Sequence, residues 1–454
     1  MTSAADGLPS PRKYWALSAA LLAMAMCVLE TTITNIALPT ISTSLGVEPA
    51  RAVWIVNAYQ LAIVATLLPC ASLGEIYGYR RVFGCGVVLF TAGSAGCALA
   101  GQFELLLACR LVQGLGAAAV MSVVPALMRF IYSQRQFGRG IGFNALVIAV
   151  SSAAGPVVGS GILAVASWPW LFGVNVPLGV YVLAVGMRAL PVVDRAARRF
   201  DGISAGLSAV FFVALIVGVE RLLSAPAMAA GCLALTVAAG FALVRRELPR
   251  PAPLLPLDLL RIKIFAYSIG ASICAFSAHS IAYIALPFYF MHGMHRSQME
   301  TGMLMMMWPL AVAVMAPIAG RLSESVSPAR LCALGTGIMA AGIGGLLLVP
   351  DGAHNGAILP FMALGGAGFG TFQTPNNRTI LTAAPRSRSG SAGGMQGTAR
   401  QFGMACGAAI AGLAFAALPA HGYIGALGAG VVLLLISSAI SLARGGAKFG
   451  TQRN

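Results

Sequence analysis

The sequence is poor in charged residues, and in acidic residues above all. Only 9% of its 454 residues are charged, and only 13 are Asp or Glu, whereas a soluble domain carries about 25% charged residues. Hydrophobic residues make up 58% of the chain, and the mean hydropathy is +0.85. This composition excludes a soluble domain and predicts an all-α integral membrane protein with many spans.

Motifs for nucleotide, metal and nucleophile chemistry are also missing. The sequence has no P-loop, no glycine-rich dinucleotide turn after a strand, no H-x-x-x-H pair and no nucleophile elbow. These absences exclude ATP as an energy source within the chain, and they predict a protein that is not an enzyme and has no cofactor or metal. Its nine cysteines lie in apolar segments without a C-x-x-C pair, so we expect buried thiols rather than a disulfide framework.

Long apolar segments are what the sequence has in abundance. A membrane-spanning helix needs about 20 apolar residues, and the sequence offers segments of this kind along its whole length. With edges uncertain by several residues, the fourteen predicted spans are 14–38, 52–74, 82–100, 104–128, 140–164, 168–190, 202–222, 226–244, 264–290, 299–320, 329–349, 355–381, 394–417 and 422–443.

The basic residues support this number of spans. If the N-terminus is cytoplasmic, 24 of the 29 Lys and Arg residues fall in inner segments, and only Arg51, Arg221 and Arg296 fall in outer ones. A wrong number of spans would mix the two sets, because each span reverses the side of the membrane. The net charge of +16 therefore indicates a lipid bilayer partner with both termini inside, and no nucleic-acid partner.

An internal repeat indicates two equivalent halves. Glu75 and Arg81 follow the second span, and Glu324 and Arg330 follow the tenth with the same spacing, at an offset of 249 residues. Two facing bundles are the architecture of secondary transporters, whose binding site lies near the membrane midplane. We predict a tail at 1–13, a six-helix bundle at 14–190, a two-helix linker at 191–263, a second bundle at 264–443 and a cytoplasmic tail at 444–454.

Arg110 lies inside the apolar segment Glu104–Val120. Its guanidinium stays charged, and a charge at membrane depth costs about 2.5–3.5 kcal/mol by insertion scales, so it needs a partner. Glu30 lies about 12 Å from the outer end of the first span, and Arg110 about 9 Å from that of the fourth, at about 1.5 Å per residue. We expect the two to pair.

Two opposing effects act on the charge state of a buried carboxyl group beside an arginine. Burial favours its neutral form, whereas the arginine favours its charged form. Such opposition can leave Glu30 poised to gain and lose a proton, which makes Glu30 and Arg110 candidates for proton coupling. The alternative is a static ion pair that holds the first and fourth spans together.

Two further motifs are candidates for gating. Glu75, Gly78, Arg80 and Arg81 form a tight turn that can lock helix ends in one state and release them in another, and Glu324 with Arg330 repeats it. The alternative is a solvated turn that obeys the positive-inside rule.

In the fifth span, Gly155, Pro156 and Gly159 predict a bent helix that packs closely against a neighbour. The alternative is a kinked helix without a gating role.

Polar and aromatic residues within apolar spans are candidates for a substrate cavity. Ordinary hydrogen bonds between helices and interfacial anchoring are the alternatives. His279 and Tyr283 share a face of the ninth span and could also contact a substrate, whereas Arg400 could extend to the inner surface. The cavity candidates are Thr34, Asn35, Trp54, Asn57, Tyr59, Gln113, Phe372, Gln373 and Asn376.

Several of these motifs, in this order, resemble one known family. The resemblance rests on five motifs: the segment Leu29–Pro39; the Glu75 turn; Arg110 with Gln113, Gly114 and Gly116; the glycines around Pro156; and Asn175–Gly179 after Trp168-Pro169-Trp170. The chain resembles the fourteen-span drug–proton antiporter branch of the major facilitator superfamily. It departs from that pattern at Glu30 and Glu75, where Asp is usual, and at Ala71 and Ser160, where Gly is usual.

The resemblance implies the major facilitator fold, two six-helix bundles with two inserted helices. It implies a multi-pass protein of the bacterial inner membrane that exports amphipathic organic compounds, such as drugs, antiseptics or dyes, in exchange for protons by alternating access. Multidrug efflux and antibiotic resistance would follow, with the monomer as the working form. The alternative is a dedicated exporter of one endogenous metabolite, antibiotic or toxin.

Overall fold

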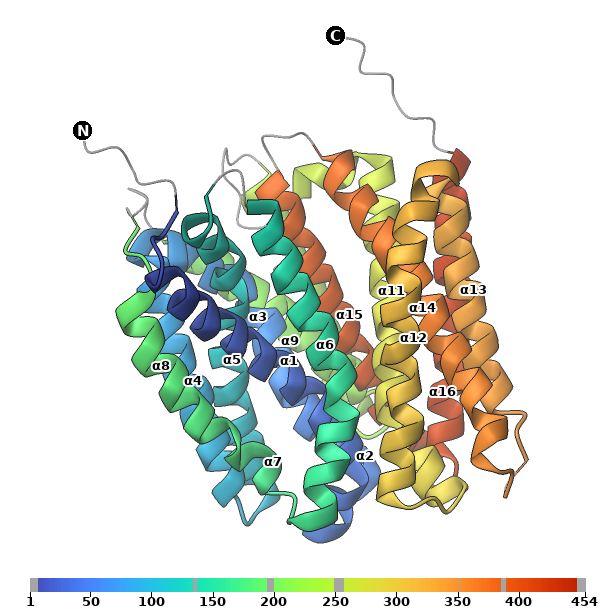
Figure 1. The fold of residues 1–454 in the computed structure, drawn as a ribbon. Coiled ribbons are helices and arrows are strands. Elements are labelled where there is room, and N and C mark those ends of the chain that lie inside the picture. The colour runs from blue at the N-terminus through green and yellow to red at the C-terminus, as the bar shows by residue number, and fades with distance from the viewer. Residues whose placement is uncertain are drawn as a thin grey trace, which may run out of the picture. The chain divides into compact units, whose positions relative to one another are not determined.

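The computed structural model describes residues 7–133, 137–193, 200–248, 257–350, 352–384 and 389–446 (Figure 1). Long helices joined by short turns make up this part of the chain, which confirms the all-α prediction. The elements are α1 (Arg12–Leu45), α2 (Pro49–Ala52), α3 (Trp54–Tyr77), α4 (Tyr79–Leu99), α5 (Phe103–Ile131), α6 (Phe137–Val165), α7 (Trp170–Gly173), α8 (Asn175–Ala189), α9 (Gly202–Glu220), α10 (Pro226–Glu247), η2 (Leu257–Arg261), α11 (Lys263–Phe288), η3 (Tyr289–Gly293), α12 (Gln298–Ser325), α13 (Pro328–Leu346), α14 (Asn355–Ala383), α15 (Ser389–Ala417) and α16 (Gly422–Gly446).

Each predicted span falls on one of the long helices, except 168–190, which covers the two shorter helices α7 and α8. Within the described ranges, twelve helices are both long and apolar enough to cross a membrane. The predicted spans on α6 and α14 are not among them: the apolar stretch of α6 covers only Val150–Val165, and α14 carries Gln373, Asn376 and Asn377. The fourteen-span count and the cytoplasmic termini therefore stay predictions.

The chain divides into two compact units, Met1–Ala209 and Val210–Asn454, with the boundary inside α9. In the first unit, α5 packs on α3 and α4, while α1 packs on α6 and α8. In the second unit, α14 packs on α12 and α13, while α11 packs on α15 and α16. The predicted linker at 191–263 is not tested by this division and stays a prediction.

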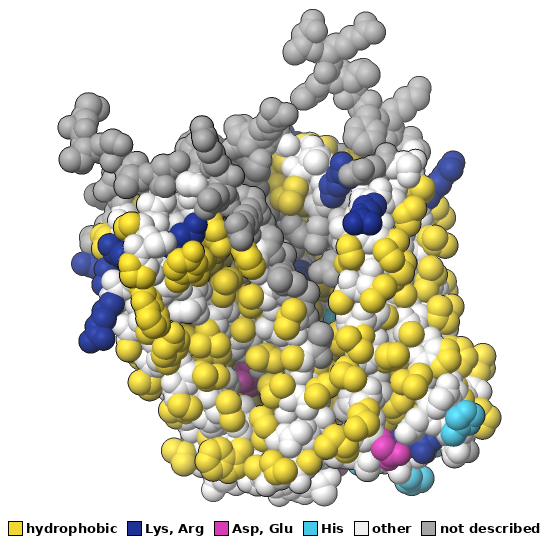
Figure 2. All heavy atoms as spheres, viewed as in Figure 1, with side chains coloured by type: hydrophobic (Ala, Val, Ile, Leu, Met, Phe, Trp, Pro, Cys, Tyr) yellow, Lys and Arg dark blue, Asp and Glu magenta, His cyan; other side chains and the backbone are white. Residues whose placement is uncertain are grey.

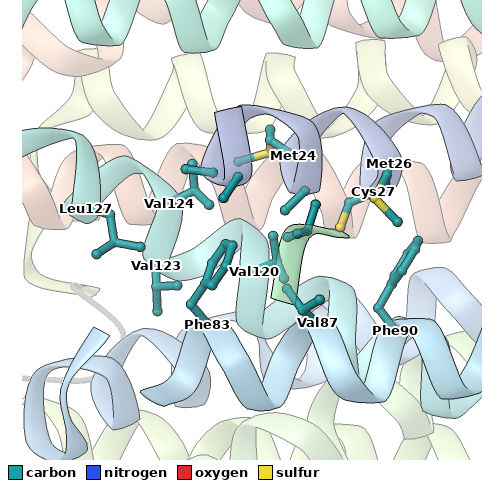
Figure 3. Close-up of a cluster of buried hydrophobic side chains, with 14 of the residues drawn as sticks. Met24, Met26, Cys27, Phe83, Val87, Phe90, Val120, Val123, Val124 and Leu127 are labelled. Carbon is teal, nitrogen blue, oxygen red and sulfur yellow. The ribbon is translucent and has the colours of Figure 1, made fainter. Parts of the chain in front are cut away.

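The core of the first unit lies between α1, α4 and α5 (Figure 3). Cys27 from α1, Phe83 and Phe90 from α4, and Val120 and Val123 from α5 are among its buried side chains. In lipid, such helix contacts stabilise by van der Waals packing rather than by removal of surface from water. Small residues allow α1, α4 and α5 to approach one another closely. The packed core fixes the positions of these helices relative to one another.

The outer surface of the helices is largely hydrophobic. Figure 2 shows hydrophobic side chains over most of the visible face, with Lys and Arg near the ends of the helices. Large apolar side chains such as Leu99, Val180 and Val237 are more than half exposed. A soluble protein rarely exposes apolar patches of this extent, whereas lipid tails accept them, so the surface is that of a membrane protein.

Candidate functional site

Glu30 of α1 and Arg110 of α5 meet inside the first unit. The Arg110 Nη1 atom lies 2.6 Å from Glu30 Oε1, and the two side chains are 1% and 2% exposed. An arginine at this depth is costly unless it is paired, and here the carboxylate supplies the counter-charge. The structure thus brings together the two residues predicted for proton coupling, while coupling itself stays a proposal.

The Glu30 carboxylate has partners on both oxygens. Oε1 accepts a hydrogen bond from Arg110 at 2.6 Å. It also lies 3.2 Å from Thr34 Oγ1, whose single hydrogen is shared with the Glu30 carbonyl oxygen at 2.8 Å. Oε2 accepts a hydrogen bond from Asn175 Nδ2, at 2.6 Å. Because Asn175 opens α8, the carboxylate joins three helices, and a change in its charge would alter contacts between α1, α5 and α8.

The Arg110 guanidinium also donates hydrogen bonds to neutral groups. Nε donates to the Ile55 carbonyl oxygen at 3.0 Å, and Nη1 also donates to Gln113 Oε1 at 2.7 Å. Gln113 Nε2 in turn donates to Ser94 Oγ of α4, at 2.8 Å. Arg110 therefore keeps hydrogen bonds to α3 and to its own helix if Glu30 loses its charge.

Two aromatic rings cover the arginine. The Arg110 Cζ atom lies 4.4 Å from the centre of the Tyr59 ring and 5.6 Å from that of Phe172. The Tyr59 hydroxyl donates to the Cys27 carbonyl oxygen at 3.0 Å, which fixes the ring beside α1. A cation over an aromatic face is stabilised by about 0.5–2 kcal/mol, and more when water is excluded.

Glycines of the predicted motifs bring these helices close together. A Cβ atom on Gly114 would lie 2.6 Å from the Tyr59 carbonyl oxygen, so only glycine allows α5 to approach α3 here. A Cβ atom on Gly155 would lie 1.8 Å from Thr32 Oγ1, and one on Gly159 would lie 2.7 Å from Ile36 Cγ2. The α6 motif thus packs on α1 within two turns of Glu30. Pro156 lies inside α6, which continues to Val165, and the predicted bend stays a prediction.

The sequence did not point to Asn175 or Ser94 as members of this network. Asn175 was noted only as part of the resemblance, and Ser94 is a single hydroxyl in an apolar helix. The available signal was an amide at the first position of α8, after Trp168. An amide such as Asn175 can be predicted to join a network only if polar groups on other helices lie at the same depth. Whether the side chains then meet depends on the rotation of each helix about its axis, which the sequence does not give.

The remaining cavity candidates of the first unit are buried at the α1 and α3 helices. Asn35 is 4% exposed and Asn57 is 1% exposed, whereas Trp54 is half-buried at the start of α3. Among the described residues, Asn35 Oδ1 and both amide atoms of Gln60 are buried without a hydrogen-bond partner. Polar atoms in this state are typical of positions that meet water or a ligand.

The candidates of the second unit lie in contacts between helices. Asn376 Nδ2 donates to the Ser268 carbonyl oxygen and to Ser272 Oγ, and its Oδ1 accepts from Arg444 Nη1 at 2.9 Å. Phe372 is fully buried in a cluster with Ala271, Ala275 and Cys332. Gln373 is half-buried on the same helix. Arg444, which the sequence analysis did not select, thus ties α16 to α11 and α14.

The gating candidates lie at helix ends. Glu75 is exposed in the last turn of α3, and Gly78 ends that helix with a φ of 98°, a conformation that favours glycine. Arg80 and Arg81 follow in the first turn of α4. In the second unit, Arg330 is exposed in the first turn of α13, while the side chain of Glu324 lies outside the described residues.

Other chemistry finds no support in the described part of the chain. The nine cysteines are free thiols, but the expectation that they are all buried is wrong. Only Cys27, Cys97 and Cys332 are buried, and Cys85 is exposed on the outer surface of α4. The described residues contain no group of three or more His, Cys, Asp and Glu side chains that could hold a metal ion.

A charged network sealed inside a bundle of apolar helices is typical of a membrane transporter. The chain belongs to the Major Facilitator Superfamily, whose family model matches residues 20–408. The family and the fold are those of multi-pass membrane transporters, which are not enzymes.

Curated relatives span nearly the whole chain. The uncharacterized transporter YebQ of Escherichia coli (strain K12) is 47% identical over 96% of this chain and 96% of its own. The riboflavin transporter RibZ of Clostridioides difficile (strain 630) is 29% identical over 85% of this chain and 84% of its own. The multidrug resistance protein Stp of Mycobacterium tuberculosis (strain CDC 1551 / Oshkosh) is 30% identical over 87% of this chain and 74% of its own.

A solved structure supports the fold. A bacterial homolog of the human lysosomal transporter Spinster matches with a TM-score of 0.68, covering 96% of this chain and 98% of its own at 15% identity. At this identity the likeness concerns the fold alone. The relatives include some drug-efflux proteins, but the fourteen-span drug–proton antiporter branch is not specifically shown.

Proposed function

We propose that the protein is a proton-coupled efflux antiporter of the bacterial plasma membrane. It exports amphipathic organic compounds by alternating access. Glu30 exchanges the proton, and Arg110 sets the balance between its charged and neutral forms. The observation that carries the proposal is the buried ion pair of these two residues.

Protonation of Glu30 would change specific contacts. It would remove the counter-charge of Arg110 and weaken the hydrogen bonds that Thr34 and Asn175 donate to the carboxylate. Arg110 would keep its bonds to Ile55 and Gln113. The proton therefore acts selectively on the contacts that α1 makes with α5 and α8, which is the differential interaction that a conformational switch requires.

The gating motifs act on the same helices in this proposal. Gly155 and Gly159 let α6 pack against α1 beyond Glu30, and Pro156 inside α6 gives that helix a place to bend. Glu75, Arg80 and Arg81 flank the sharp α3–α4 turn at Gly78. A switch at Glu30 would thus reach α6 through the packing of α6 on α1, while the charged α3–α4 turn would act as a separate gate.

The substrate class is supported from two directions. Stp, a multidrug resistance protein, favours an exporter of varied organic compounds. RibZ, a riboflavin transporter, favours the second candidate, a dedicated exporter of one endogenous metabolite, antibiotic or toxin. Both candidates use the same Glu30 site, so they differ in cargo and not in the coupling step.

Dye uptake into inverted membrane vesicles tests the proposal. An imposed proton gradient should drive uptake of a fluorescent amphipathic dye, an uncoupler should stop it, and Glu30→Gln should abolish it while the protein still reaches the membrane. Glu104→Gln is the matched control, because Glu104 is an exposed carboxylate that pairs with Arg51. Normal gradient-driven uptake by Glu30→Gln would refute the coupling role.

Riboflavin uptake in the same vesicles separates the two candidates. Gradient-driven movement of several unrelated dyes supports the multidrug exporter. Movement of riboflavin or of another compound made by the host, with no movement of any dye, supports the dedicated transporter instead.

A further inference from the structure

The repeat offset relates the charged site of the first unit to residues of the second unit. Adding 249 to position 30 gives His279, and adding it to position 59 gives Trp308. The same offset carries α1 onto α11 and α3 onto α12. The second unit therefore has neutral or titratable rings at the positions where the first unit has Glu30 and its neighbour Tyr59.

His279 and Trp308 belong to one group of packed rings. The His279 ring stacks on Phe369 of α14, with centres 4.2 Å apart and an angle of 12° between the planes. It also lies 4.5 Å from the Tyr283 ring and 5.9 Å from the Trp308 ring. Phe276 packs edge-on against Phe369 at 5.3 Å. We name these five residues the aromatic cluster.

Two nitrogen atoms of the aromatic cluster have no hydrogen-bond partner among the described residues. They are Trp308 Nε1 and His279 Nδ1, both buried. Trp308 is 0% exposed, whereas the His279 side chain is half-buried. A buried polar atom without a partner is unfavourable. The Trp308 Nε1 atom can only donate, and His279 Nδ1 donates in one of its two neutral tautomers, so a ligand that supplies acceptors would satisfy both.

The position of Trp308 is fixed by two glycines of α14. A Cβ atom on Gly365 would lie 2.3 Å from Trp308 Cζ3, and one on Gly366 would lie 2.1 Å from the Trp308 carbonyl oxygen. The indole is thus seated directly on the α14 backbone. Its N–H group is held in place rather than free to turn toward a partner, which is the condition for a preorganised donor.

The charges of the surrounding helices favour an acceptor-rich ligand. No Asp or Glu occurs in α11, α14 or α15, and the two acids of α12, Glu300 and Glu324, lie in its first and last turns, away from Trp308 in the middle of the helix. Arg400 of α15 makes no hydrogen bond or ion pair with the described residues, and its Nε atom is buried. α15 packs on α11 through Gly403, which faces Ile273, and Arg400 lies one turn away on the same side of α15.

We propose that the aromatic cluster binds a planar aromatic compound that carries hydrogen-bond acceptors and is neutral or anionic. The rings stack on the planar system, the Trp308 and His279 nitrogens bond its acceptors, and Arg400 selects against cations. The inference rests on the proposed function, since the bound compound is the one exported.

Two dyes with the same ring system test this inference. Fluorescein is a planar xanthene with negative charge, and tetramethylrosamine is a xanthene with positive charge and no acidic group. Binding of each to the purified full-length protein in detergent is measured by fluorescence anisotropy. We expect fluorescein to bind about tenfold more tightly, a difference of about 1.4 kcal/mol.

Three substitutions locate the bound dye. Trp308→Phe removes the N–H group but keeps a ring, and His279→Phe removes the ring nitrogens; each should weaken fluorescein binding about tenfold. Arg400→Gln should remove the preference for the anionic dye. Trp170→Phe and Arg51→Gln are the matched controls, because both residues are exposed in the first unit, and they should leave binding unchanged.

Three results would overturn the inference. The first is tighter binding of tetramethylrosamine than of fluorescein, and the second is unchanged fluorescein binding in the cluster variants. The third is loss of fluorescein binding when phosphatidylglycerol nanodiscs replace detergent, because lipid head groups would then be the ligand of Arg400. Gel filtration and circular dichroism check that each variant is folded, and His279→Phe decides alone if Trp308→Phe does not fold.

The binding assay needs no proton gradient, so it separates the two proposals. Glu30→Gln should still bind fluorescein. If Glu30→Gln transports normally while the cluster variants lose fluorescein, only the coupling proposal fails. If Glu30→Gln stops transport while the cluster variants bind fluorescein normally, only the present inference fails.

Discussion

In the first unit, Glu30 and Arg110 form a buried ion pair in which both carboxylate oxygens have partners. In the second unit, the repeat places His279 and Trp308 at the positions of Glu30 and Tyr59, and each has a buried nitrogen without a partner among the described residues. The helix arrangement is repeated, but the polar chemistry is not. A self-contained charged network suits a switch, whereas unpaired donors suit recognition.

The second unit also has a polar network, but it is built differently. Arg444 bonds Ser268 and Asn376, which are neutral. Among the described residues of this network there is no carboxylate, so a proton has no acidic group to act on there. In the proposed mechanism, a buried arginine therefore serves coupling only where its partner is an acid.

The largest effect is expected for Arg110→Gln. It leaves the Glu30 carboxylate buried without its counter-charge, and breaking a buried pair in this way costs about 3–5 kcal/mol. Thermal unfolding in detergent should show the loss, and gradient-driven dye uptake should cease. The double variant Glu30→Gln with Arg110→Gln should regain most of the stability but not the transport. Wild-type stability in the single variant would contradict a tight pair.

The next effect concerns helix packing in the second unit. Gly366→Ala places a methyl group against the Trp308 backbone, and overpacking of this kind costs about 1–3 kcal/mol. Gly337→Ala on α13 is the matched control, since no atom lies within 4 Å of its Cβ position. Thermal unfolding compares the two variants. Equal stability would mean that α12 and α14 can separate without cost.

A smaller effect is expected for Asn175→Ala. The variant removes the hydrogen bond to Glu30 Oε2, and an unpaired buried polar atom costs about 1–3 kcal/mol. Dye uptake at a fixed gradient should fall without being abolished, because the pair with Arg110 remains. Ser160→Ala, which removes only a bond to the backbone of its own helix, provides the comparison. Unchanged uptake in Asn175→Ala would exclude α8 from the switch.

The smallest effect is expected for Arg51→Gln. Arg51 and Glu104 pair at 3.1 Å, but their side chains are 57% and 74% exposed. Exposed pairs contribute about 0–1 kcal/mol and are screened by salt. Thermal unfolding at low and high salt should show a small difference that salt removes. A loss as large as that of Arg110→Gln would erase the distinction between exposed and buried pairs.

The sequence predicted features that depend on position along a helix. The apolar segments, the repeat at Glu75 and Glu324, and the similar depth of Glu30 and Arg110 all follow from residue spacing. Rotation about each helix axis and the choice of neighbours do not follow from spacing. For that reason the sequence alone could not predict three contacts: the hydrogen bond from Asn175 to Glu30, the hydrogen bond from Arg444 to Asn376, and the ring contact of His279 with Trp308.

The native thiols could report on motion in the charged network without any engineered label. The Cys97 side chain is buried, and its Sγ atom lies 4.0 Å from Gln113 Oε1. Cys85, on the same helix, is exposed. The rate at which a maleimide alkylates Cys97 relative to Cys85 would therefore measure how often α4 and α5 part, and a proton gradient that changes this ratio would make the opening visible in time.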